Sequence, residues 1–357
     1  MPKQNHPSVI TNCLRLLLFT ALSACITPFD IDVENTGNIA VVAGQVSNLP
    51  DQTFVQLGLT VNKVQLASPV SGARVWIIDE TTGDSTMLYE SATTVGLYQP
   101  SYYTGVPGHA YHVAVQFPDK TAYLSETDVM PSLPGTVRSY YDFGRQQYTD
   151  LEGIVSEQPF LFAHVDAHLP DTDEKYYLKW SVEEVFLLSP TDFPDVWGNI
   201  PDPCFIAQYA EPQRVVLFNG NNIHTRTLED VLVAQRVVDW SFLEKHAFTI
   251  YQSSISLAAH EYWTKVDILA NQSGSVFDQP PAALPGNVHA VEPGERALGF
   301  FYATAQVMDR FVVYRTDVPF PLTFPDCQYN NDRSNYPTRC LDCTSVRNSS
   351  SRRPEWF

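Results

Sequence analysis

Between residues 38 and 135 short apolar segments alternate with polar turns, as expected for a β-rich domain. In "YHVAVQF" every second residue is apolar, so Tyr111, Val113, Val115 and Phe117 are expected on one buried face of a strand. In "ARVWIID" the alternation is broken, which predicts a strand buried on both faces. About seven such segments, with turns roughly every 8 to 12 residues, are typical of an immunoglobulin-like β-sandwich. "MPSLPG" interrupts the pattern, and we predict the end of this domain there.

Residues 136–325 are predicted to form a second β-rich domain that carries one helix. "FLFAHVDAHL" and "KYYLKWSVEEVFLL" are strand-like, whereas apolar residues between 257 and 270 recur at helical spacing behind Ser256, a suitable N-cap. The positions that define the apolar face of this amphipathic helix are Ala259, Tyr262, Trp263, Val266 and Leu269. Residues 326–357 are a polar tail that contains cysteines. The predicted fold class is therefore mainly β.

The amino terminus has the layout of a secretory signal peptide. An apolar run from Leu16 to Leu22 follows positive charge and leads through small Ser23 and Ala24 to Cys25. The run is much shorter than the roughly 20 apolar residues that a membrane-spanning helix needs. "LSAC" resembles the bacterial lipobox, which implies cleavage after residue 24 and lipidation of Cys25. An ordinary signal peptide with a cysteine near its cleavage site is the alternative.

Residues 25–37 are acidic and lack periodicity, which predicts a tether between the lipid and the first domain. Asp30, Asp32 and Glu34 resemble the signal that sends Bacteroidota lipoproteins to the outer face of the outer membrane, although any solvated linker can be acidic. The formal charge of the whole chain is −18. Removal of a signal peptide that holds two basic and no acidic residues makes the mature chain still more negative, so nucleic acid is not an expected partner.

Four cysteines remain after Cys13 and Cys25 are set aside, and in an exported chain they favour disulfides. These candidates are Cys204, Cys327, Cys340 and Cys343. The close pair in "CLDC" could also suggest zinc or a redox dithiol, but a second pair and a βαβ setting are missing from the sequence around it. Which of the three possible pairings forms is left open.

The segment from Ala258 to Ala303 resembles the most recognisable block of a Bacteroidota lipoprotein family, domain of unknown function 4249. The residues that carry the resemblance are Tyr262 and Trp263 on the helix, then Gly274, Ser275, Phe277, Asp278, Pro281, Gly286, Asn287, His289 and Leu298 to Phe301. Matching segments also occur nearer the amino terminus, in "VVAGQVS" and "SPVSGARVWIIDETTG". The resemblance implies an outer-membrane lipoprotein that acts beside a TonB-dependent transporter. It implies no catalytic residue.

Local motifs for catalysis are absent from the sequence. "HEYWT" begins like a zinc-protease helix, but Thr264 stands where the second histidine is required. "HVDAH" places His164, Asp166 and His168 on one strand face, a weak candidate for metal binding because the side chains are spaced too widely to reach one ion unaided. A solvated polar face is favoured there. We expect no cofactor and no enzymatic activity, while a triad assembled from distant residues is left open.

Adjacent tyrosines could offer stacking platforms for sugars or peptides. Such pairs occur at Tyr102-Tyr103, Tyr140-Tyr141 and Tyr176-Tyr177, and on a strand one member of each is expected to face outward. The favoured interpretation is a non-catalytic binding or accessory module, lipid-anchored at the cell surface, with an unknown ligand. The alternative is a structural or adhesive envelope lipoprotein without a small-molecule ligand.

Overall fold

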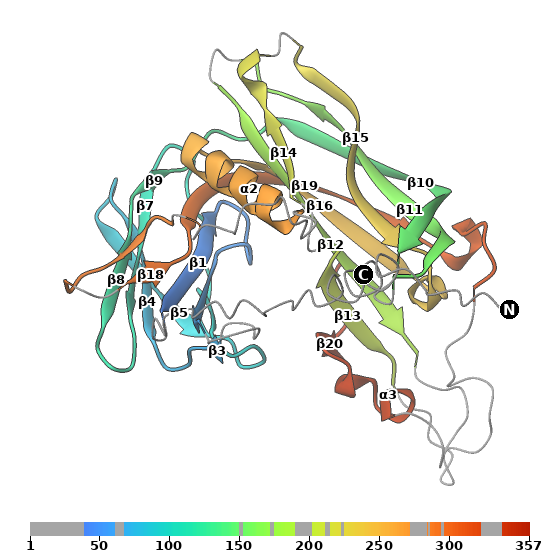
Figure 1. Ribbon diagram of the computed structural model, residues 1–357, viewed down its shortest axis with the longest axis horizontal. Helices are drawn as coiled ribbons and strands as arrows, with labels where there is room; N and C mark the ends of the chain where they lie inside the picture. The colour runs from blue at the N-terminus through green and yellow to red at the C-terminus, as the bar shows by residue number, and fades with distance from the viewer. Residues whose placement is uncertain are drawn as a thin grey trace, which may run out of the picture. The chain divides into compact units, whose positions relative to one another are not determined.

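The computed structural model describes residues 39–60, 68–149, 153–171, 175–189, 202–210, 215–222, 225–271, 284, 286–293, 296–322 and 338–357. The predicted signal peptide, Cys25 and the acidic tether lie outside these residues. The described part of the chain is built mainly of strands, which confirms the predicted fold class (Figure 1).

The first group of strands forms a β-sandwich. Its members are β1 (Ala40–Ser47), β2 (Phe54–Leu59), β3 (Ser68–Pro69), β4 (Arg74–Asp79), β5 (Asp84–Glu90), β6 (Leu97–Gln99), β7 (Ala110–Gln116), β8 (Ala122–Ser125) and β9 (Asp128–Val129). β1, β2, β3 and β6 make one layer, and β4, β7, β8 and β9 make the other, while β5 pairs with both β4 and β6. Val42 and Leu57 from one layer and Ile77 and Val113 from the other share one buried core.

The alternation rule works along β7 and also, against expectation, along β4. Tyr111, Val113 and Val115 are buried on one face of β7, as predicted. In β4, Val75 and Ile77 are buried but Trp76 and Ile78 are only half-buried. The prediction that this strand is buried on both faces is therefore wrong. Large apolar side chains can occupy the outer face of an antiparallel sheet because that face is partly shielded rather than fully wet.

Three strands from far along the chain complete this sandwich: β17 (Val288–Ala290), β18 (Ala297–Leu298) and β19 (Phe301–Val313). β17 pairs with β8, while β18 and the start of β19 run parallel to β1. Gly299 lies between β18 and β19 with φ +108°, and a Cβ there would lie 2.0 Å from the Val42 carbonyl oxygen. Glycine is needed at this position both for its backbone conformation and for this close approach.

A second group of strands surrounds β12. It contains β12 (Tyr177–Leu188), β13 (Cys204–Tyr209), β14 (Val216–Asn219), β16 (His246–Ser254), β20 (Ser349–Ser350) and again β19. β12 pairs with β13, β14 and β16, and β16 pairs along its whole length with β19. The predicted boundary near residue 135 stays a prediction, because β19 belongs to both groups of strands.

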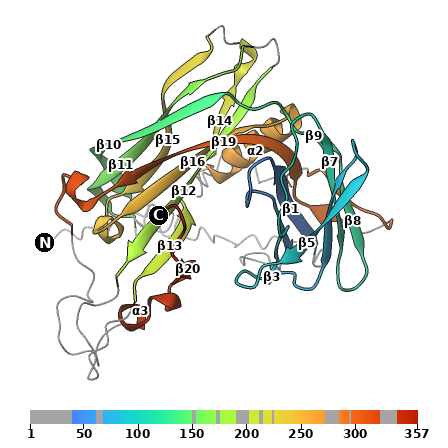
Figure 2. The same cartoon turned by 180° about the vertical axis from the view of Figure 1, so that it is seen from behind.

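A separate three-stranded sheet covers one face of this second group. It consists of β10 (Thr136–Thr149), β11 (Val155–His168) and β15 (Thr227–Val237), which lie side by side in both views (Figure 2). Leu161 and Val165 of β11 share a buried core with Trp180 of β12 and with Phe248 and Ile250 of β16. The three strands thus close a second apolar core.

Helix α2 (Leu257–Ala270) is the long helix among the described residues and matches the predicted range. The shorter helical turns are η1 (Gly220–Asn222), η2 (Trp240–Phe242), η3 (Arg315–Asp317), α3 (Thr338–Leu341) and η6 (Cys343–Ser345). α2 packs on β12 and β14 (Figure 1). Within the described ranges, no helix combines the length and apolar character needed to cross a membrane.

Candidate functional site

Helix α2 contributes aromatic side chains to the candidate site. Ser256 has an extended backbone and its hydroxyl accepts a hydrogen bond from the Ala259 N–H, so the predicted N-cap is confirmed. One turn later Tyr262 and Trp263 pack against the segment that leads into β19. The Tyr262 and Phe300 rings are stacked, with centroids 4.3 Å apart and planes inclined by 15°. This packing fixes the position of the helix over the strands.

A partly enclosed cavity of about 300 Å³ lies between α2 and strands β1, β12 and β19. Seven aromatic residues line it: Phe54, Trp180, Tyr209, Tyr262, Trp263, Phe300 and Tyr302. Its polar contributions come from Gln45, Gln52, Lys179 and Ser181. Apolar walls with a few converging polar groups are the usual composition of a small-molecule site.

Lys179 supplies the cation of the cavity. It follows buried Leu178 on β12, and its Nζ lies 4.8 Å from the centroid of the Trp263 ring. Burial lowers the pKa of the ammonium from 10.5 to about 8. Within the described part of the chain Lys179 has no carboxylate partner and no hydrogen-bond acceptor. The ammonium is therefore desolvated without compensation by an opposite charge.

The polar groups near β1 are held in place by direct hydrogen bonds. The Tyr302 hydroxyl donates to Gln45 Oε1 at 2.7 Å, and Gln45 Nε2 donates to the Gln52 carbonyl at 2.8 Å. Burial raises the pKa of Tyr302, so this hydroxyl keeps its proton at neutral pH. The buried Nε1 of Trp263 lies near the same Tyr302 hydroxyl, although this contact is not well aligned. The cavity thus contains one fixed polar corner and one ammonium, Lys179, that lacks an acceptor among the described residues.

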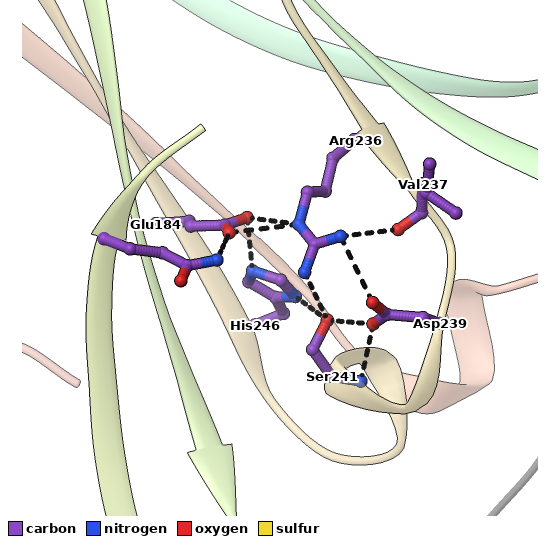
Figure 3. Close-up of polar contacts among 7 residues, drawn as sticks. Glu184, Arg236, Val237, Asp239, Ser241 and His246 are labelled. Atoms are coloured by element: carbon purple, nitrogen blue, oxygen red, sulfur yellow. Dashed lines mark hydrogen bonds and ion pairs between the residues drawn. The ribbon is translucent and has the colours of Figure 1, made fainter. Parts of the chain in front are cut away.

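A second polar cluster lies inside the core between β12, β15 and β16 (Figure 3). Glu184 accepts from Arg236 Nε and contacts His246 Nε2, each at 3.0 Å. Arg236 also donates to Asp239, and the Ser241 hydroxyl donates to Asp239 at 2.6 Å. Glu184 and His246 are completely buried. The cluster ties three strands and the η2 turn together.

The charges in this cluster are set by burial and by the neighbouring groups. Burial raises the pKa of Glu184, but the His246 hydrogen bond and the Arg236 charge outweigh it and lower the pKa to about 2. Burial lowers the pKa of His246, so at neutral pH the imidazole is uncharged and donates one N–H to Glu184. The result is a buried carboxylate paired with a guanidinium, which is costly to disrupt by removal of either partner.

Ser241, His246 and Glu184 have the residue types of a hydrolytic triad, but their geometry suits structure better. The Ser241 hydroxyl donates a hydrogen bond to Asp239, while His246 Nδ1 is 3.4 Å away, at the weak end of hydrogen bonding. Ser241 is also fully buried, so a substrate carbonyl has no route to its oxygen. Sequence reasoning missed these residues because they lie on three different elements, with Glu184 62 positions before His246. A glutamate within the apolar strand "SVEEVFLL" was the available signal.

The weak metal candidate His164, Asp166 and His168 does not form a shared ligand set. His164 Nδ1 lies 2.8 Å from Asp230, and Asp166 pairs with Arg138 at 2.6 Å. His168 instead contacts the Thr227 hydroxyl. Among the residues that the structure describes, no group of three or more His, Cys, Asp or Glu side chains is arranged to hold a metal ion. Each side chain is used in a separate contact across the β10–β11–β15 sheet.

Two of the four candidate cysteines form a disulfide, between Cys204 on β13 and Cys343. The bond lies against Phe186 and Leu188 in a small apolar cluster and holds the carboxyl-terminal segment, whose β20 pairs with β13. Cys327 and the side chain of Cys340 lie outside the described residues, as does the lipidation candidate Cys25.

The tyrosine pairs follow the expected alternation only in part. Tyr176 and Tyr177 are only 4% and 7% exposed, so the prediction that one of them faces outward is wrong. The reason is that α2 covers the second face of β12, where the Tyr177 ring lies 5.0 Å from the His260 ring. Tyr102, by contrast, is 86% exposed.

The family model "Domain of unknown function (DUF4249)" matches residues 26–310. This range includes α2 and the residues of the cavity, and it confirms the family resemblance inferred from the sequence. No curated protein and no solved structure matches the chain.

Proposed function

Because the chain belongs to the DUF4249 family, whose function is unknown, we propose a function from its own residues: a lipid-anchored, surface-exposed outer-membrane protein that binds a small molecule without catalysis. In this proposal it serves as an accessory module of a TonB-dependent nutrient uptake system. The observation that carries the binding role is the aromatic cavity between α2, β1, β12 and β19.

The cavity supports binding because its walls are rigid and mostly apolar. Tyr262 and Phe300 are stacked on each other, and Gln45 is fixed by Tyr302. A preformed site loses little conformational entropy when a ligand enters. The described polar cluster around Glu184, in contrast, is buried and internally paired, which favours a structural role over turnover.

The membrane placement rests on the amino-terminal sequence. Cys25 follows a lipobox-like segment, and two or three acyl chains anchor firmly because each buried methylene contributes about 0.8 kcal/mol. Labelling of the native host with a radioactive or alkyne fatty acid should label the wild-type protein, and Cys25→Ser should remain unlabelled and leave the membrane fraction. Retention of Cys25→Ser in the membrane would contradict the proposed anchor.

The accessory role is tested by affinity purification of the tagged full-length protein under mild detergent. We expect a TonB-dependent outer-membrane transporter to copurify, with the Cys25→Ser protein as the control for membrane attachment. Isolation of the wild-type protein alone would contradict this part of the proposal.

A structural or adhesive lipoprotein is the alternative, and the cavity distinguishes it. Ala43→Trp fills the cavity from β1, whereas Ala258→Trp adds the same side chain at an exposed position of α2 outside it. If the protein works in uptake, a deletion strain should grow poorly on particular nutrients and be rescued by wild type and Ala258→Trp, but not by Ala43→Trp. Rescue by all three proteins would favour the structural role.

A further inference from the structure

The cavity holds one cationic hydrogen-bond donor, Lys179 Nζ, that has no acceptor among the described residues. The ammonium lies 4.8 Å from the centroid of the Trp263 ring. A desolvated donor of this kind is uncommon, since it costs free energy that a bond to an acceptor would recover. The indole N–H of Trp263, in contrast, lies near the Tyr302 hydroxyl.

The composition of the cavity wall limits what that group is. The chain contains 40 acidic and 22 basic residues, yet no described aspartate or glutamate lines the cavity. Elsewhere in the same core the buried cation Arg236 is paired with Glu184 at 3.0 Å. Lys179 has no such carboxylate beside it. Its neighbour is the face of the Trp263 ring, which attracts a cation but carries no negative charge to neutralise it. Since no carboxylate lies in the described wall, an anionic ligand is the partner that would neutralise Lys179.

The remainder of the wall determines the shape of the ligand. Tyr262 and Phe300 stack in nearly parallel planes, and Trp263 meets Tyr262 almost edge-on at 81°. Flat aromatic surfaces of this kind bind planar or ring-shaped apolar groups. We propose that the cavity binds an organic acid in which a ring-bearing apolar body lies against these aromatic side chains and a carboxylate accepts a hydrogen bond from the Lys179 ammonium. This inference rests on the proposed binding function and adds the chemical class of its ligand.

The test uses two probes that differ only in charge, 2-naphthoate and 2-naphthamide, with the mature full-length protein and isothermal titration calorimetry at pH 7. The naphthoate should bind at least about 10-fold more tightly, because a charge-assisted hydrogen bond contributes about 1.4 kcal/mol or more. Lys179→Met keeps the length of the side chain and should remove this preference, while Lys265→Met at an exposed site on α2 should retain it. Thermal unfolding establishes that both variants fold.

A pH series gives a second measurement. Because burial lowers the pKa of Lys179 to about 8, naphthoate affinity should fall between pH 8 and pH 10 while naphthamide affinity stays constant. Equal binding of both probes, or naphthoate binding that Lys179→Met leaves intact, would overturn the acid inference and leave the binding function standing. If neither probe binds the wild-type protein at millimolar concentration, both proposals are contradicted.

Discussion

Lys179 is expected to lower the stability of the fold, so its removal should stabilise the protein. The fall of its pKa from 10.5 to about 8 corresponds to about 3 kcal/mol of unfavourable desolvation at neutral pH. Met at this position keeps an apolar side chain of similar length over Trp263 and carries no charge. We therefore expect Lys179→Met to raise the free energy of unfolding by about 2–3 kcal/mol at pH 7.

The stability advantage of Lys179→Met should depend on pH. The unfolded chain holds the Lys179 proton up to about pH 10.5, whereas the folded chain releases it near pH 8. Between these values the unfolded state binds more protons, so the wild type gains stability as pH rises. The advantage of Lys179→Met should be full below pH 8 and disappear by about pH 10.5.

Urea unfolding of the wild type and variant at several pH values measures this difference directly. Lys265→Met, which removes an exposed lysine from α2, should change the free energy by no more than about 0.5 kcal/mol. A Lys179→Met protein that is less stable than the wild type, or an advantage that persists unchanged at pH 10.5, would refute the reasoning.

Three further substitutions test the framework around the cavity. Glu184→Gln removes the buried counter-ion of Arg236 and leaves it only the more exposed Asp239. It should cost about 3–5 kcal/mol in urea unfolding, with exposed Glu229→Gln as the near-neutral control. Because the pKa of Glu184 is lowered from 4.5 to about 2, its stabilisation should be complete above pH 4.5 and be lost as the pH falls toward 2; a pH-independent cost would count against the ion pair. Cys343→Ser removes a bond across a sequence separation of 139 and should lower stability by about 2–5 kcal/mol, a difference that must vanish when the wild type is reduced. Gly299→Ala should cost at least about 2 kcal/mol more than Gly108→Ala in thermal or urea unfolding, since both glycines have positive φ but only Gly299 faces a backbone oxygen; equal costs would show that the close approach is unimportant.

The sequence predicted those features that depend on local periodicity. The buried face of β7, the range of α2 and its Ser256 cap all follow from spacing within a few residues, and the structure confirms them. Burial on the second face of a strand was harder to predict. Tyr177 is covered by a helix that is distant in sequence, whereas Trp76 is left half-exposed, and neither outcome is encoded in the strand itself.

The cavity could not be predicted because its wall is assembled from segments throughout the chain. Gln45 and Tyr302 are 257 positions apart, yet they form one corner of it. Two signals were nevertheless present in the sequence: the adjacent aromatic residues Tyr262 and Trp263 on the helix, and Lys179 alone among apolar neighbours in "YYLKWSV". A lysine at such a position has either a buried partner or a ligand, and only the structure distinguishes these cases.

Strand β19 also has a consequence for how the protein reaches its native state. Its residues 301–304 complete the sheet next to β1, and from Ala305 onward the same strand aligns with β16. The edge of β1 therefore stays unpaired until residues 301–304 have been synthesised and have reached it. Pairing over such long sequence separations is slow, because the entropy of loop closure is lost before any contact is gained. Until that segment arrives, the open edge of β1 is available to other strands, so a ribosome-stalled or truncated product that ends before residue 301 should need a chaperone to stay unaggregated.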